Sequence, residues 1–237
     1  MTTKLTTMRG VDPRYPMSDG EPMADNTTQQ RWIMMLIAEL RDLFAGQEVF
    51  VAGDLLWYPI KGDAKTRIAP DALVAFGRPP GEMGAYLQWE EGGVAPQVVF
   101  EVLSPKNTRA EMERKREAYE RFGVEEYYEI DPDRETVRGW LRREGRLDEI
   151  AEMADWRSPR LGIRFELQPG RLRLIRPDGR AFQFVEDALR ERDAARRERD
   201  TALRERDSAV RERDSAVRER DRLAAKLREL GIDPNAP

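Results

Sequence analysis

Residues 97–103, with the sequence QVVFEVL, form an almost uninterrupted apolar run. Such a run is typical of a central strand that is covered on both faces. Further along, Thr108 and Glu111 have the spacing of a capping box, which predicts the start of a helix. Gly123 suits the position that ends this helix. Residues 126–130, EYYEI, then predict a second strand, so this part of the chain is expected to form strand, helix and strand in succession.

The residues before this stretch predict a helix followed by several strands. The helix begins near Asn26 or Thr27, either of which can cap it. Residues 48–60 indicate strand, turn and strand, residues 71–76 indicate a short strand, and residues 77–95 have the turn residues of a loop. The helix has apolar residues at helical spacing, which predicts one buried face: Trp32, Met35, Leu36, Leu40 and Leu43.

The remaining segments complete a mixed α/β domain. Hairpin-like segments within residues 136–185 predict a β extension after the second strand. Helix, strands, helix, strand and β extension together indicate a mixed α/β fold. We expect this domain to span residues 25–187. A flexible arm (1–24) precedes it, and a long helix (188–230) and a short tail (231–237) follow it.

From Leu189 onward the chain repeats every seven residues, as RERDAAR, RERDTAL, RERDSAV and RERDSAV. Aspartates stand four residues before arginines, which supports a long helix. One apolar stripe, Leu203, Val210 and Val217, follows the repeat, whereas a strong coiled coil needs two apolar positions per heptad. A solvated charged helix and a weak coiled-coil helix for oligomerisation both agree with this pattern. Coiled-coil spacing occurs only at the end, at Leu223, Leu227 and Leu230.

The composition excludes several classes of site. The 237 residues include neither cysteine nor histidine, which excludes thiolate chemistry, histidine bases and zinc sites built on these residues. A metal would need oxygen ligands, which favours magnesium, manganese or calcium. Residues 189–230 carry 14 basic and 11 acidic side chains, and the rest of the chain has a net charge of −7. An acidic body argues against a general nucleic-acid coating protein.

The hydropathy of the chain favours a location in the cytoplasm. The amino-terminal residues MTTKLTTMRG are polar, without the apolar core of a secretory signal. The longest helical apolar stretch, residues 32–38, is far shorter than a membrane span. We therefore expect a cytoplasmic protein without a membrane partner.

Three charged residues interrupt apolar patterns and are candidates for chemistry. Glu101 lies within the apolar run, where a carboxylate is costly unless an ion pair, a metal or an edge position accommodates it. Asp71 follows Pro70 at the start of a strand, where it is either a turn residue or a second carboxylate that converges on a cation with Glu101. Lys115 lies in the apolar stripe of its helix, so it either extends to the rim or serves an acidic cluster.

Two carboxylates and a lysine around one divalent cation form a device for phosphodiester hydrolysis. The carboxylates hold the metal, which polarises the phosphate and lowers the pKa of bound water, and the lysine offsets the developing charge. We therefore expect Asp71, Glu101 and Lys115 to form one site with Mg²⁺ or Mn²⁺. Asp54 is either a further acidic ligand or a turn residue, and we favour the turn. Glu39 on the first helix either lines the site or is solvated, and we favour the solvated side chain.

Residues 25–184 resemble a known family. The resemblance rests on IAPDALVAFGRP, VAPQVVFEVLSP and KREAYERFGVEEYYEIDPDR, which occur in this order. They are similar to the Uma-two family of restriction-endonuclease-like proteins, which is assigned to the PD-(D/E)XK nuclease superfamily. The resemblance implies an α-β-β-β-α-β core, in agreement with the predicted order of elements, and a metal-dependent DNA endonuclease.

The resemblance also implies roles for individual residues. Asp71 resembles the PD aspartate, and Glu101 resembles the acidic residue of the (D/E)XK motif. The lysine expected two residues after Glu101 is Leu103 in this chain. In several members of the superfamily this lysine lies on the following helix, where Lys115 is placed to fill the role. Lys106, in the intervening loop, is the alternative.

The expected substrate and cofactor follow from the same resemblance, and the expected homodimer follows from the weak apolar stripe of the long helix. Duplex DNA is the expected substrate, and Mg²⁺ or Mn²⁺ is expected to bind the two carboxylates and the backbone carbonyl of Val102. A homodimer joined mainly through its bodies would present one site to each strand. The alternative is a catalytically inactive nuclease-fold protein that acts as a binding or scaffold protein, which the acidic body and Leu103 favour.

Overall fold

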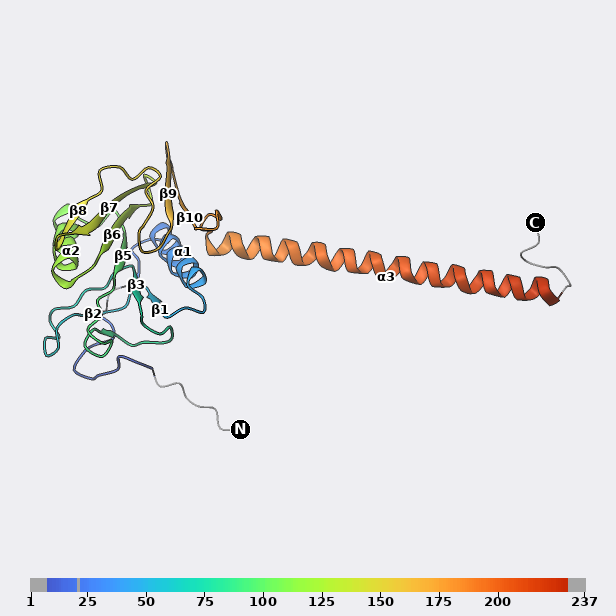
Figure 1. Cartoon of the computed structure of the whole chain (residues 1–237), viewed down its shortest axis with the longest axis horizontal. Coiled ribbons are helices and arrows are strands. Elements are labelled where there is room, and N and C mark those ends of the chain that lie inside the picture. The colour runs from blue at the N-terminus through green and yellow to red at the C-terminus, as the bar shows by residue number, and fades with distance from the viewer. Residues whose placement is uncertain (1–7, 21, 230–237) are drawn as a thin grey trace. The chain divides into compact units, whose positions relative to one another are not determined.

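The computed structural model describes residues 8–20 and 22–229, and its centre is a six-stranded mixed sheet (Figure 1). The four inner strands are flanked by two short edge strands of four residues each. In spatial order the strands are β1 (Val49–Ala52), β3 (Ala72–Phe76), β5 (Val98–Val102), β6 (Glu126–Asp131), β7 (Thr136–Arg143) and β8 (Arg146–Glu149).

Two helices cover opposite faces of this sheet. Helix α1 (Thr27–Leu43) contributes Leu36 and Leu40 to an apolar cluster that also contains Phe100 of β5. Helix α2 (Arg109–Phe122) contributes Tyr119 to a second cluster, on the other face. The order α1, β1, β3, β5, α2, β6 is the α-β-β-β-α-β order predicted from the sequence, and the predicted fold class is confirmed.

The local signals for both helices act as predicted. The Asn26 side chain accepts a hydrogen bond from the Gln29 N–H, and α1 begins directly after Asn26. Thr108 accepts from the Glu111 N–H at the start of α2. Gly123, with φ of 97°, adopts the left-handed conformation that glycine tolerates best and ends α2. These caps fix where α2 begins and ends relative to the strands on either side of it.

The register of the strands places acidic residues on the face covered by α2. In the antiparallel pair of β3 and β5, Ala72 lies opposite Phe100, so Asp71, just before β3, is brought beside Glu101. In the parallel pair of β5 and β6, Glu101 is aligned with Glu129. Because Phe100 faces α1 and successive residues of a strand point to opposite faces, Glu101 faces α2.

The segment expected to be a loop, residues 77–95, contains a short strand. This strand, β4 (Tyr86–Leu87), pairs in parallel with β2 (Trp57–Tyr58) in a separate two-stranded sheet. The strand, turn and strand expected in residues 48–60 are present, but β2 pairs with β4 and not with β1. A two-residue strand has no period of its own, so its pairing is set by distant residues.

The β extension is a hairpin that completes the cluster under α1. Its strands are β9 (Arg164–Gln168) and β10 (Arg171–Ile175), which pair antiparallel. Phe165, Leu172 and Leu174 belong to the same apolar cluster as the buried face of α1. The predicted β extension is therefore part of the core.

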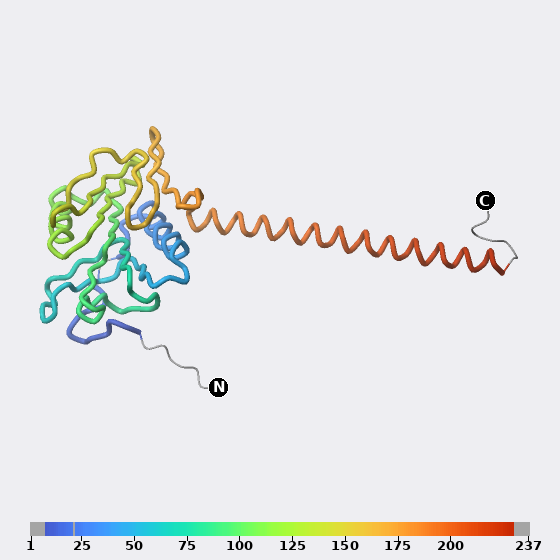
Figure 2. The backbone as a smooth tube through the Cα atoms, viewed as in Figure 1, coloured from blue at the N-terminus to red at the C-terminus, as the bar shows by residue number. Residues whose placement is uncertain are grey.

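The described part of the predicted flexible arm packs against the body, contrary to the expectation (Figure 2). Arg9 forms an ion pair of 2.7 Å with Glu91 and a parallel bridge with Met83. Tyr15 is 4 % exposed because its ring packs against Tyr58 and Trp89. Backbone hydrogen bonds of Arg9 with Glu82 and Gly84 also hold this segment, and none of these contacts has a periodic pattern in the sequence. Residues 1–7 and 21 of the expected arm lie outside the described residues.

Helix α3 (Val185–Glu229) is one continuous helix that forms a unit of its own. It begins slightly earlier than the expected residue 188, and the last expected residue, Leu230, lies outside the described residues, as does the expected tail. None of its described residues is buried. Among residues 8–20 and 22–229, no helix combines the length and apolar character that a membrane crossing requires.

Candidate active site

The structure brings Asp71, Glu101 and Lys115 together on the α2 face of the sheet. The ammonium nitrogen of Lys115 lies 2.8 Å from Oε2 of Glu101. Asp71 accepts a hydrogen bond of 2.6 Å from the backbone N–H of Val102, the residue after Glu101. Three elements therefore contribute to one cluster: the entry to β3, the strand β5 and the helix α2.

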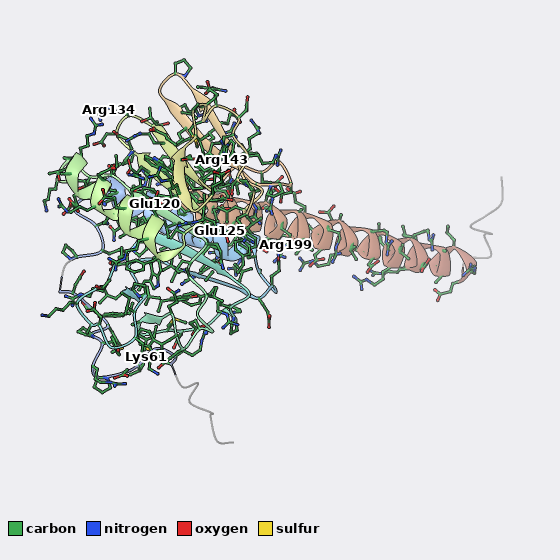
Figure 3. The ribbon with its side chains drawn as sticks, turned by 60° about the vertical axis from the view of Figure 1, so that its left-hand side comes forward. Lys61, Glu120, Glu125, Arg134, Arg143 and Arg199 are labelled. Carbon is green, nitrogen blue, oxygen red and sulfur yellow. The ribbon has the colours of Figure 1, made fainter. Side chains whose placement is uncertain are left out.

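Helix α2 holds the lysine because its carboxyl end is fixed to the sheet. Glu120, labelled on this helix in Figure 3, accepts a hydrogen bond of 2.8 Å from the backbone N–H of Leu147 in β8. Arg142 of β7 donates to backbone carbonyls of the last turn of α2, including that of Glu120. With both helix ends fixed, Lys115 and Tyr119 point from successive turns toward β5.

Glu101 is the most enclosed member of the cluster, with 2 % of its surface exposed. Lys115 donates to one carboxylate oxygen and the hydroxyl of Tyr119 donates to the other. Burial, followed by the negative charge of Glu101, raises the pKa of Tyr119 well above its ordinary value, so the hydroxyl keeps its proton and remains a donor. The buried ion pair that the sequence allowed at Glu101 is present, on the same side of the sheet as Asp71.

The charges of the cluster alter the pKa of both other members. Burial raises the pKa of Asp71 well above its ordinary value, and the negative charge of Glu101 adds to this effect. Burial acts to lower the pKa of Lys115, but Glu101 and its hydrogen bond outweigh burial and raise that pKa. A positively charged group near Asp71 would lower its pKa again, which is the effect a bound cation has.

A cavity of about 530 Å³ opens onto this cluster. Asp71 and Lys115 line it, whereas Glu101 lies behind them. Asp54, expected to be a turn residue, has a positive φ of 50° and also lines the cavity. Burial and then the charge of Asp19 raise the pKa of Asp54. The cavity wall therefore carries more acidic residues than the sequence predicted for the site.

The donor chemistry fits a hard divalent cation bound by few protein ligands. Asp71 offers a carboxylate oxygen at the cavity, whereas both carboxylate oxygens of Glu101 already accept hydrogen bonds from Lys115 and Tyr119. The Val102 carbonyl accepts a hydrogen bond of 2.8 Å from the side-chain amide of Gln29. In the part of the chain that the structure describes, no group of three or more acidic side chains is arranged to hold a metal ion. Mg²⁺ is commonly bound by one or two carboxylates with water and substrate phosphate completing its shell.

The structure distinguishes the two candidate lysines by their partners. Lys106 lies 2.6 Å from Oδ1 of Asp25, in an exposed ion pair. Lys115 contacts Glu101. The ion pair of Lys115 therefore joins it to a member of the carboxylate cluster, and that of Lys106 joins it to Asp25.

Glu39 was expected to be solvated, but its side chain is engaged in contacts within the protein. Its carboxylate accepts a hydrogen bond of 3.1 Å from Arg176 and one of 3.0 Å from the backbone N–H of Gln183. Glu39 therefore joins α1 to the segment after β10. The helical pattern alone could not reveal a partner so distant in the sequence. Glu39 belongs to this structural ion pair and has no contact with the cluster of Asp71, Glu101 and Lys115 among those described.

Three residues near the cluster were not singled out by the sequence. Tyr119 donates to Glu101, and Gln29 donates to the Val102 carbonyl. Glu129 is 6 % exposed and accepts a hydrogen bond of 2.7 Å from the Tyr127 hydroxyl, and burial raises its pKa. A signal existed for two of them. Tyr119 follows Lys115 by one helical turn, and Glu129 occupies in its strand the place that Glu101 occupies in β5.

The fold is that of a nuclease-like α/β protein, and the comparison with known families agrees. Residues 3–174 match the model of the family Uma2, described as "Putative restriction endonuclease". The chain belongs to this family, and the relation supports a nuclease. The predicted resemblance is confirmed.

A solved structure is also similar to this chain. It is described as a "putative nuclease belonging to DUF820" from Anabaena variabilis, with 18 % identity and a TM-score of 0.45. The match covers 59 % of this chain and 74 % of that chain. No curated protein matches this chain significantly.

Proposed function

We propose that this protein is a metal-dependent endonuclease that hydrolyses phosphodiester bonds of duplex DNA. The observation that carries the proposal is the meeting of Asp71, Glu101 and Lys115 on one side of the sheet, at a cavity. Asp71 and Glu101 would hold Mg²⁺ or Mn²⁺, with the Val102 carbonyl as a further ligand. Such an ion supplies Lewis acidity toward the phosphate and a more acidic water.

The residues of the chain would then act through position and charge. Lys115 keeps its proton because its pKa is raised, and its ammonium group can offset negative charge that develops on the phosphate. The Val102 N–H fixes the orientation of Asp71, and Tyr119 fixes one oxygen of Glu101. Lys115 replaces the lysine that Leu103 does not provide.

The test is plasmid cleavage with Mg²⁺ or Mn²⁺ by the full chain and by matched variants. We expect Asp71→Asn and Lys115→Met to reduce cleavage at least about a hundredfold, as loss of a charge-stabilising group does. Lys106→Met is the control, because it removes an exposed lysine. If Lys106→Met abolishes cleavage and Lys115→Met does not, the lysine is wrongly assigned.

The alternative function is a nuclease-fold protein without catalysis, used for binding or as a scaffold. Leu103 and the acidic charge of residues 1–188 favour it. Absence of cleavage by wild-type protein on plasmid and oligonucleotide duplexes with either metal would support this alternative. DNA binding by the same protein, measured in EDTA, then distinguishes a DNA-binding protein from a scaffold.

We also propose a cytoplasmic homodimer whose contacts lie mainly in the body. Two sites related by a two-fold axis would suit the two strands of a duplex. Sedimentation equilibrium of the full chain and of a form ending at Asp187 tests this. A dimeric full chain with a monomeric truncated form would place the contacts in the tail instead.

A further inference from the structure

Helix α3 carries an apolar stripe whose side chains are exposed. Leu203, Val210 and Val217 are 42, 42 and 40 % exposed. Because they recur every seven residues, they lie along one side of the helix at intervals of about 10.5 Å. Such a row at heptad spacing is the kind of seam along which a second helix packs.

The charges beside this stripe are ordered as well. Successive residues are about 100° apart around the helix axis, so Arg206 lies about 60° to one side of Leu203. On the other side, Asp207 lies about 40° and Arg204 about 100° from Leu203. The same arrangement recurs around Val210 and Val217, whereas Arg196 stands at the stripe position of the first repeat. Figure 3 shows side chains projecting around α3, with Arg199 labelled among them. The stripe is therefore bordered by two rows of arginines.

The ion pairs within α3 do not use up these arginines. Arg206 lies 3.2 Å from the adjacent Asp207, and Arg213 lies 3.3 Å from the adjacent Asp214. The two arginine side chains remain 70 and 75 % exposed. Exposed pairs of this kind are weak, so the arginines can turn toward a partner at little cost.

A second copy of α3 fits this face poorly. The apolar stripe occupies one of the two seam positions of a heptad, and aspartates such as Asp200 and Asp207 occupy the other. Two parallel copies in register would place aspartate against aspartate in the seam and arginine against arginine at its borders. An antiparallel pair would also oppose arginine to arginine. Both arrangements bury or oppose like charges.

Nucleic acid also fits less well than a helix does. Residues 190–221 contain 11 arginines and 10 acidic residues, a net charge of +1. The aspartate row lies between the arginine rows, where a phosphate backbone would meet it. Affinity for phosphates rests on an excess of positive charge, which this helix lacks.

We propose that α3 is a docking surface for an amphipathic helix of another protein. That helix would carry one apolar residue per heptad against the Leu–Val stripe, basic residues against the aspartates, and glutamates along both borders against the arginines. Charge complementarity defines this partner, since each row of charged side chains on α3 would face side chains of the opposite charge. The proposal is independent of endonuclease activity.

The test uses the full chain and two synthetic peptides of four heptads, followed by fluorescence anisotropy. Both peptides carry leucine and lysine in the seam; one has glutamate and the other lysine at the borders. We expect the glutamate peptide to bind at least about tenfold more tightly than the lysine peptide, which corresponds to about 1.4 kcal/mol. Added salt should weaken this binding.

Two matched double variants locate the surface. Leu203→Asp/Val210→Asp should weaken binding of the glutamate peptide at least about tenfold. Thr201→Asp/Ser208→Asp adds the same charge on the far side of the helix and should leave binding nearly unchanged. Circular dichroism of both variants checks that α3 remains helical.

Three results would overturn the proposal. One is equal binding, or no binding, of the two peptides. Another is self-association in sedimentation equilibrium that the Leu203→Asp/Val210→Asp variant abolishes, which would make a second copy the occupant. The third is displacement of the glutamate peptide by a DNA duplex in EDTA, which would make nucleic acid the ligand.

Discussion

The sheet face under α2 and the long helix α3 are both rich in charge, but the ion pair under α2 is largely buried and the ion pairs on α3 are exposed to solvent. The Lys115–Glu101 pair has side chains 26 and 3 % exposed, whereas the Arg206–Asp207 pair has side chains 70 and 58 % exposed. Glu101 is almost fully enclosed, so little water can replace its partner, whereas water reaches both members of the pair on α3. An ion pair between a basic side chain and a carboxylate therefore determines local structure in one region and contributes little in the other.

Removal of Lys115 gives the strongest test of this difference. Lys115→Met leaves Glu101 buried with only the Tyr119 hydroxyl as a donor, so we expect a loss of about 3 kcal/mol in the free energy of unfolding. Urea unfolding measures it. Unchanged stability would show that water reaches Glu101 in the native state and that the ion pair with Lys115 is not needed there.

Cation binding should affect only the region under α2. At about a hundred times its dissociation constant, Mg²⁺ should stabilise the wild-type protein by about 2.7 kcal/mol, and it should not stabilise Asp71→Asn. Thermal unfolding with and without Mg²⁺ measures this. Equal stabilisation of both forms would show that the ion binds elsewhere.

Without metal, the pH dependence of the free energy of unfolding should differ between the wild-type protein and Asp71→Asn. Because the pKa of Asp71 is raised in the folded state, the folded protein binds this proton more tightly than the unfolded chain. The stabilisation that this bound proton gives the folded protein is fully present below the ordinary aspartate pKa, and it is lost as pH rises through the raised pKa of folded Asp71. We expect Asp71→Asn to gain stability relative to wild type over that interval. A difference that does not vary with pH would contradict it.

Tyr119→Phe should have a moderate effect, since it removes one donor and leaves the ring packing intact. We expect a loss of about 1–2 kcal/mol in stability from the unsatisfied oxygen of Glu101. Tyr127→Phe, which removes the donor to Glu129, is the matched control for metal affinity. Only Tyr119→Phe should weaken Mg²⁺ binding, as measured by calorimetry.

The smallest effect is expected on α3. Arg206→Gln breaks an exposed pair and should change stability by less than about 0.5 kcal/mol. Urea unfolding of the full chain measures it beside Lys115→Met. A larger loss would show that α3 has contacts beyond those described.

The sequence predicted those parts of the molecule that local patterns specify. The apolar run of β5, the capping box of α2 and Gly123 each act within a few residues, so strand, helix and strand were found with nearly correct bounds. Asp71, Glu101 and Lys115 were recognised because each breaks a local pattern. The three side chains meet on one face of the sheet, and their catalytic roles remain predictions.

What the sequence could not predict depends on distant contacts. The pairing of β4 with β2, the burial of Tyr15 against Trp89, and the ion pair of Glu39 with Arg176 join residues that no periodic pattern relates. In the site, the hydroxyl of Tyr119 was overlooked because a tyrosine on an apolar helix face is expected to pack. Its polar end acquires a role only when the register of β5 places Glu101 beneath it.

The βαβ connection from β5 through α2 to β6 also has a consequence for the order of folding. Lys115 and Tyr119 reach Glu101 across separations of 14 and 18 residues, whereas Asp71 reaches Val102 across 31. Closing a shorter loop costs less chain entropy and is faster. The lysine, tyrosine and glutamate can therefore assemble within a single contiguous segment, and the aspartate joins when β3 docks. A circular permutant opened between β3 and β5 would keep that segment intact and lengthen only the path to Asp71.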